Sequence, residues 1–201
     1  MKCLAIDTSG AHLTVALIDE NSVVYEFIKD TGLKHSISLM PAIEKVLQKS
    51  QTNLNEIDVF ASVIGPGSFT GIRIGVSTAK ALAYANDKSV LAITSFEVLE
   101  YNKENGKNLA IIDARHNNYY AMGFTDRVES YKASFLSGEE IIKLSKDYEI
   151  LSATDSELNK ANCSYLDGLI RAVREKISQA TKDKETLIPL YVKKSQAEEA
   201  L

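Results

Sequence analysis

One segment of the chain combines the residue types of an anion-binding loop. Residues 65–75 read Gly-Pro-Gly-Ser-Phe-Thr-Gly-Ile-Arg-Ile-Gly and follow an apolar, strand-like run over residues 59–64. Pro and Gly end the strand, and Ser68 stands at the N-cap position of the helix that follows. Free backbone N–H groups at such a helix N-terminus attract phosphate. A nucleotide-hydrolysing phosphate loop also needs Lys and then Ser or Thr after its last glycine, whereas Gly71 is followed by Ile and Arg, so the pattern disfavours that class of site.

The same helix has a small residue at every fourth position. Gly67, Gly71, Gly75, Ala79 and Ala83 therefore lie on one face of it. Each glycine inside a helix costs about 1 kcal/mol relative to alanine, so we expect a compensating close approach of another backbone. That backbone belongs either to a helix of a partner protein or to the protein's own sheet, and the sequence leaves both interpretations open.

Further polar candidates follow two apolar runs. Asp7, Thr8 and Ser9 come directly after residues 3–6, and Asp113 ends a second apolar run. Both sites could be remnants of phosphate loops. Asp, Ser and Thr also form turns, because their side chains accept hydrogen bonds from nearby backbone N–H groups. We favour this turn-forming role over catalysis.

The three histidines form no local metal pair, because His12, His35 and His116 are more than four residues apart. We expect His12 and His116 to be solvated in turns, and His35 to lie at the surface or in an interface near a helix start. Ser68, His35 and Asp7 could be combined into a serine triad only by disregarding the N-cap role of Ser68 and the turn role of Asp7. The sequence therefore predicts no catalytic residue, no metal site and no cofactor.

Alternating strands and helices would position these residues. Apolar periodicity and turn residues predict strands at 3–6, 13–18, 23–28, 59–64 and 90–93, and helices at about 34–49, 68–85 and 95–102. The polar run at 102–108 then breaks the pattern and predicts a boundary between a lobe of residues 1–103 and a second lobe of residues 104–201.

The second lobe weakly repeats the first. An ungapped offset of 106 residues aligns Ile6-Asp7 with Ile112-Asp113 and Val15 with Ala121. After this meander the pattern predicts only a helix at 138–146, a strand near 149–152 and an amphipathic helix at 165–180. We therefore expect an α/β protein with a duplicated two-lobe fold and a shortened second lobe.

The composition excludes several classes of protein. The chain has 201 residues, a formal net charge of −4 and no basic run interleaved with aromatic residues, so it lacks the pattern of an autonomous nucleic-acid-binding protein. Cys3 and Cys163 have no CxxC companion, which predicts reduced thiols of a cytoplasmic protein. No 18-residue apolar run and no signal peptide are evident, so we expect no membrane association.

Five segments together resemble the TsaB family, which comprises bacterial accessory subunits for threonylcarbamoyladenosine modification of tRNA. They are Ala5–Ser9, His35-Ser36 with Met40-Pro41, Gly65–Gly75, Asp113–Arg115 and Pro189–Tyr191. The resemblance spans nearly the whole chain, and the Gly65–Gly75 segment is its most specific part. It implies an actin-like (ASKHA, ribonuclease H-like) fold, shared with hexokinase-type sugar kinases. It also implies kinship with the TsaD subunit, which transfers threonylcarbamoyl to adenosine 37 of tRNAs that read codons beginning with A.

Comparison with TsaD-type proteins predicts that this chain has lost their chemistry. The TsaD-type relative has two metal-binding histidines four apart, and Ser95 and Leu99 stand at the matching positions here. An actin-like nucleotide cleft also needs a glycine-rich loop in the second lobe. After Gly123 the only glycines are the isolated Gly138 and Gly168, so we expect an incomplete cleft. Older naming called the family a glycoprotease, but the chain has no HExxH motif or serine triad to support peptidase chemistry.

The resemblance therefore implies a non-catalytic scaffold that binds TsaD and, with it, the small ATPase TsaE, contacts tRNA only indirectly, and forms a homodimer when alone. We expect helices 34–49 and 68–85 to pair with the equivalent helices of TsaD, through His35, Leu39, Ile43, Ser68, Gly71, Arg73, Gly75 and Ala79. Two alternatives stay open. One is an actin-fold small-molecule kinase or acyltransferase that acts alone through Asp7 and the Gly65 loop, and the other is a stand-alone RNA-binding module, which the acidic balance disfavours.

Overall fold

Two mixed β-sheets form the framework of the protein, in a computed structural model that describes residues 1–31 and 34–193. The first sheet has the strand order β3(Val23–Ile28)-β2(Leu13–Ile18)-β1(Cys3–Asp7)-β4(Val59–Val63)-β5(Ser89–Ile93). Strands β1 to β3 pair antiparallel, and β1, β4 and β5 pair parallel. The second sheet has the order β8(Val128–Ser137)-β7(Asn118–Thr125)-β6(Lys107–Asp113)-β9(Glu149–Leu151).

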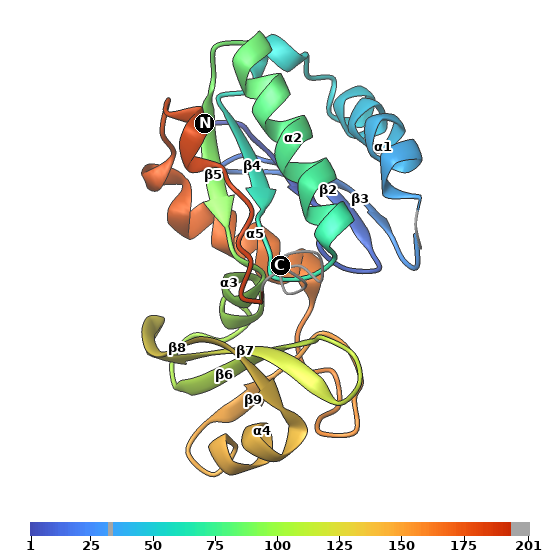
Figure 1. Cartoon of the computed structure of the whole chain (residues 1–201). Helices are drawn as coiled ribbons and strands as arrows, with labels where there is room; N and C mark the ends of the chain where they lie inside the picture. Colours follow the sequence, from blue (N-terminus) through green and yellow to red (C-terminus); the bar gives the residue numbers. More distant parts are fainter. Residues whose placement is uncertain (32–33, 194–201) are drawn as a thin grey trace.

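Helices cover both faces of the first sheet (Figure 1). Helices α1(His35–Ser50) and α2(Phe69–Ala85) pack on one face, and α5(Tyr165–Lys176) packs on the other. The strands β1, β2 and β4 are buried along their whole length, which explains why their sequences are continuous apolar runs. In the second sheet the short helix α4(Gly138–Leu144) connects β8 to β9.

The second sheet lies below the first in Figure 1, with α3(Ser95–Glu100) between them. Phe96 and Leu99 of this helix join a core cluster with residues of β6, β7 and β9, whereas Val98 packs with the first sheet. Helix α3 therefore connects the hydrophobic cores of the two sheets.

The order of the strands confirms the predicted duplication, because β3-β2-β1-β4 and β8-β7-β6-β9 have the same connectivity. The ungapped offset of 106 residues is correct for Asp113 but wrong in the next strand. Asp7 pairs with Thr14, whereas Asp113 pairs with Tyr119, so the second turn is one residue shorter. Because a one-residue shift moves every side chain to the other face of a strand, Val15 corresponds to Tyr120 and not to Ala121.

The C-terminal part of the chain returns to the first sheet. Leu169, Ala172 and Val173 of α5 pack against β1, β4 and β5, and Leu187 joins the core on the opposite face. The predicted second lobe of residues 104–201 therefore combines segments that pack on different sheets. The division at 103/104 coincides with the entry into β6, and as a domain boundary it stays a prediction.

The predicted helices and strands agree with the observed bounds to within a few residues. Three short 3-10 helices, η1(Leu54–Glu56), η2(Ile177–Gln179) and η3(Lys184–Thr186), were not predicted as separate elements. Within residues 1–31 and 34–193, the helices are too short or too polar to traverse a lipid bilayer.

Candidate functional site

Helix α2 begins at the loop that the sequence singles out. As predicted, Ser68 is the N-cap, and its Oγ accepts a hydrogen bond from the Gly71 N–H at 3.2 Å. The Ser68 N–H in turn donates to the carbonyl of Ser9 at 2.7 Å. Gly67 makes this approach possible, since its φ is +156° and a Cβ there would lie 2.3 Å from the Ser9 carbonyl oxygen. The loop after β4 and the turn after β1 therefore support each other.

The glycine ladder faces the protein's own sheet, so its assignment as a partner-binding seam is wrong. A Cβ at Gly71 would lie 2.0 Å from the Thr8 carbonyl oxygen, and one at Gly75 would lie 2.4 Å from Thr8 Oγ1. Ala79 is fully buried on the same face. The Thr8 hydroxyl also donates to the Gly71 carbonyl at 2.7 Å. Thus the turn after β1, and not a partner helix, explains the small side chains.

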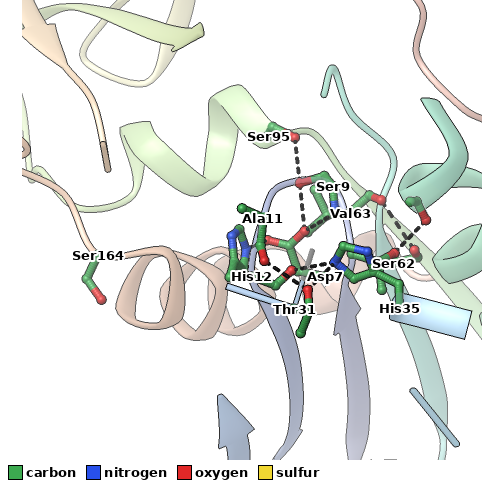
Figure 2. Close-up of polar contacts among 12 residues, drawn as sticks. Asp7, Ser9, Ala11, His12, Thr31, His35, Ser62, Val63, Ser95 and Ser164 are labelled. Carbon is green, nitrogen blue, oxygen red and sulfur yellow. Dashed lines mark hydrogen bonds and ion pairs between the residues drawn. The ribbon is translucent and has the colours of Figure 1, made fainter. Parts of the chain in front are cut away.

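Asp7 is the centre of a buried polar cluster in that turn (Figure 2). One carboxylate oxygen accepts hydrogen bonds from the Ser9 N–H at 2.9 Å and from the Ser9 hydroxyl at 2.7 Å. The other lies 2.8 Å from His12 Nε2. Burial by itself raises the pKa of Asp7, but the charge of His12 and the hydrogen bonds from His12 and Ser9 outweigh it, and the pKa lies below its ordinary value. Asp7 is therefore an internally paired carboxylate.

The order of groups in this cluster does not suit a serine hydrolase. A catalytic triad needs the imidazole between the serine and the carboxylate, whereas Asp7 lies here between Ser9 and His12. The imidazole of His12 is also stacked on Tyr165, with ring centroids 4.0 Å apart. These contacts stabilise the turn and engage Asp7, Ser9 and His12 with one another.

The structure corrects the predicted environments of two histidines. His12 is buried and not solvated, because Asp7 and Tyr165 surround its ring. His35 is also buried, with Nε2 lying 2.9 Å from Thr31 Oγ1 and 2.9 Å from the His12 carbonyl oxygen. It thus connects the start of α1 to the β1–β2 turn and cannot face a partner. His116 is exposed, as predicted.

The predicted second turn, at Asp113, has the same local geometry in a different environment. Asp113 Oδ1 accepts from the Arg115 N–H at 2.8 Å, which is the bond that Asp7 makes with Ser9. Both aspartates therefore form the turn that the sequence predicts. Asp113 itself is exposed.

A cavity of about 480 Å³ opens between the two sheets beside the Asp113 turn. It is lined by Pro66, Gly67, Phe69, Ile72, Ala114, Arg115, His116, Asn118, Tyr120, Phe135 and the segment 190–193. Neither Asp7 nor its neighbours Thr8 and Ser9 line it. The structure therefore does not bring the two candidate phosphate loops together in one site.

The positions that match the metal ligands of TsaD-type proteins have structural contacts here. Ser95 donates from Oγ to Ser9 Oγ at 3.3 Å, and Leu99 belongs to the core cluster between the sheets. In the described part of the chain, no three His, Cys, Asp or Glu side chains come close enough to hold a metal ion.

The outer surfaces of α1 and α2 carry exposed apolar side chains beside these motifs. A groove of about 630 Å³ runs between the helices and is lined by Ser36, Leu39, Met40, Phe69, Thr70, Arg73, Ile74, Ser77 and Thr78. At its edges the exposed fractions are 73% for Ile37, 46% for Met40 and 37% for Phe69. The helix periodicity suggests a single apolar face for α1, but in the structure some of these residues lie in the core and others in the groove. Leu39 and Ile43 belong to the core, so their assignment to a partner interface is wrong, apart from the edge that Leu39 presents to the groove.

Of the side chains predicted to bind a partner, Arg73 and Ser68 are exposed. The guanidinium carbon of Arg73 lies 3.9 Å from the ring centroid of Phe69, and its Nε–H donates to the Tyr191 hydroxyl at 2.9 Å. Phe69 and Tyr191 were not among the residues predicted to bind a partner. The four-residue spacing between Phe69 and Arg73 was an available signal, because such pairs meet on a helix surface.

A sequence model of the family described as "TsaD: tRNA N6-adenosine threonylcarbamoyltransferase" matches residues 29–165, more than half of the chain. The chain belongs to the TsaD family. Within it the chain is of the TsaB type, as the resemblance predicts. It is 38% identical over 122 residues to the TsaB protein of Bacillus subtilis, covering 60% of this chain and 53% of that protein. It is 34% identical over 146 residues to that of Haemophilus influenzae, covering 69% and 61%. These matches thus span about half to three fifths of the relatives' own length.

Solved structures agree with this assignment at the level of the fold. YeaZ from Pseudomonas aeruginosa has a TM-score of 0.73 at 21% identity, with 94% of this chain and 99% of that chain covered. A protein described as similar to peptidase YeaZ from the same organism has a TM-score of 0.77 at 20% identity, with 96% and 99% covered. The predicted α/β fold is confirmed.

Proposed function

We propose that the TsaB-type chain is a non-catalytic scaffold subunit in the synthesis of threonylcarbamoyladenosine in tRNA. In this proposal it binds the TsaD-type transferase, and with it a TsaE-type ATPase, in the cytoplasm, and it contacts tRNA only through these partners. The observation that carries the proposal is a contrast between two sets of side chains. Asp7, Ser9 and His12 are paired with one another inside the protein, whereas exposed apolar groups gather along the α1–α2 groove.

The internal pairing of Asp7 supports the non-catalytic part of this proposal. A carboxylate that holds a metal–phosphate complex must be accessible to it, but Asp7 is buried and both its oxygens have partners. Releasing Asp7 would leave His12 without its ion-pair partner in the interior, which is energetically costly. A nucleotide or metal therefore has no accessible carboxylate in this turn.

The groove supports the partner-binding part. Contiguous exposed apolar surface that is rimmed by polar groups is typical of protein–protein interfaces. Met40 and Phe69 provide such surface in the groove, Ile37 adds an exposed apolar side chain on the same helix as Met40, and Ser36, Thr70 and Ser77 also line the groove. When no partner is present, two copies can cover the same surface by a two-fold arrangement, which is the proposed homodimer.

The decisive experiment is a reconstituted transfer reaction with the TsaD-type transferase, the TsaE-type ATPase, the activated threonylcarbamoyl intermediate and tRNA. Omission of this chain should abolish multiple-turnover modification, and the chain alone should neither modify tRNA nor hydrolyse ATP. Modification by this chain alone would contradict the scaffold role, and full activity without it would contradict the need for a scaffold. Titration of the isolated chain with ATP distinguishes the scaffold from an enzyme that acts alone, since only the latter should bind ATP tightly.

A further inference from the structure

We propose that Arg73 is a carboxylate receptor built into the α1–α2 groove, so that the partner bound there presents an acidic side chain to it. This inference rests on the proposed function, because it names the chemistry by which the scaffold recognises its partner. It also predicts that a second copy of this chain satisfies the groove less well than that partner does.

The side chain of Arg73 is held in place from two sides. Its guanidinium lies over the ring of Phe69, four residues earlier on α2, and its Nε–H donates to the Tyr191 hydroxyl. The rings of Phe69 and Tyr191 are stacked on each other, with centroids 4.8 Å apart. An arginine that is already oriented loses less conformational entropy when it binds a carboxylate.

Tyr191 is itself positioned by the segment that leads to it. Leu187 is fully buried in the core under α1 and α2, and the Leu190 N–H donates to the Ile64 carbonyl at 2.8 Å. This segment therefore holds the tyrosine hydroxyl at the start of α2, where it can orient Arg73. Tyr191 is a positioning residue in this proposal, since it acts on the partner through Arg73.

The charge distribution of the groove favours an anion. Its lining includes Arg73 and the hydroxyl residues Ser36, Thr70, Ser77 and Thr78, but no carboxylate among the described residues. Described residues accept one hydrogen bond from this guanidinium, from Nε to Tyr191, and none of them accepts a bond from its terminal N–H groups. Two parallel N–H groups match the two oxygens of a carboxylate.

Among the described residues, the lining of the groove supplies no carboxylate to a second copy of the chain. A two-fold dimer through the groove brings together two identical surfaces, each with one Arg73. Like charges brought close together in such a dimer repel each other, and the described lining offers neither guanidinium an ion pair. The groove thus combines an attractive element for an acidic partner with a repulsive element against self-association.

The test measures the dissociation constant between this chain and the TsaD-type transferase of the same organism, at low and high salt, and the homodimer dissociation constant by sedimentation. Arg73→Gln should weaken transferase binding by at least about tenfold and reduce its salt dependence. Arg73→Lys should rescue only part of the loss, and Tyr191→Phe should weaken binding by about threefold. The homodimer of Arg73→Gln should be as stable as the wild-type homodimer, or more stable. Arg174→Gln on α5, an exposed arginine outside the groove, is the matched control and should change neither constant.

Each outcome bears on one of the two proposals. If the wild-type chain fails to bind the transferase, both the scaffold role and this inference are wrong. If the wild type binds and Arg73→Gln binds equally well, the scaffold role stands and the carboxylate receptor is wrong. If Arg73→Gln leaves transferase binding unchanged but the complex retains tRNA less well, the carboxylate receptor is also wrong and Arg73 contacts a phosphate instead. Neutralising the acidic residues on the docking helices of the transferase one at a time should reveal one substitution that is non-additive with Arg73→Gln.

Discussion

Helix α2 has an inner and an outer face with different roles, although residues of both faces were predicted to bind a partner. The inner face, with Gly71, Gly75 and Ala79, is in contact with Thr8 and the sheet. The outer face, with Phe69 and Arg73, lines the groove and is exposed. Spacing thus reveals which residues share a face, whereas the neighbouring elements decide whether that face is available to a partner.

The strongest test of the comparison is Gly71→Leu. We expect little or no folded protein, because even a Cβ at this position would lie 2.0 Å from a backbone oxygen that cannot move without displacing β1. Ser77→Leu on the outer face of the same helix is the matched control and should change the free energy of unfolding by about 0.5 kcal/mol or less. Circular dichroism during urea unfolding measures both. A folded Gly71→Leu variant with lost partner binding would show that the ladder is an interface after all.

The next largest effect concerns the turn that the inner face contacts. His12→Ala should destabilise the protein by about 3 kcal/mol, because Asp7 would remain buried without its partner. The carboxylate pKa of Asp7 in the folded protein is below its ordinary value of 3.8, so its stabilising contribution is present above pH 3.8 and is lost as the pH falls through the folded pKa. Thermal unfolding between pH 2 and pH 6 (about two units either side of that value) should show this loss of stability as the pH falls. A His12→Ala variant as stable as the wild type would mean that the cluster does not brace the turn.

Substitutions on the outer face should weaken binding to the transferase much more than they change the free energy of unfolding. Phe69→Ala and Met40→Ala should each weaken transferase binding about tenfold, because large side chains at the centre of an interface dominate its affinity. The effect on unfolding should stay at about 0.5 kcal/mol for Met40→Ala, which is exposed, and reach about 1 kcal/mol for Phe69→Ala, which also loses its stacking on Tyr191. Val128→Ala on β8, where the exposed fraction is 70%, is a control outside the groove and should leave affinity unchanged. Equal affinity for all three variants would place the interface elsewhere.

The smallest expected effect is at the residue where the two faces meet. Ser68→Ala should cost about 1 kcal/mol of stability through loss of the N-cap, and Ser68→Asp should retain most of it. Transferase affinity should change less than twofold for Ser68→Asp if Ser68 is structural. A large loss of affinity in a stable Ser68→Asp variant would return Ser68 to the interface.

The order of the elements and the family could be predicted from the sequence alone. The apolar runs of β1, β2 and β4 are long enough to be recognised without their neighbours, and Ser68 before the glycine-rich helix is a local N-cap signal. Local patterns also predicted both aspartate turns, because an Asp side chain bonds to a backbone N–H two residues later in the chain.

Which of these residues are accessible depends on how the elements pack together. His12 and His35 have the sequence context of solvated turn and surface residues, yet Asp7, Thr31 and Tyr165 come from separate elements to bury them. Tyr191 likewise supports Phe69 and Arg73 on the outer face, although it lies more than one hundred positions further along the chain. Periodicity within one helix carries no information about such distant contacts, so the direction in which the ladder faces could be learned only from the packing of α2 on β1 and its turn.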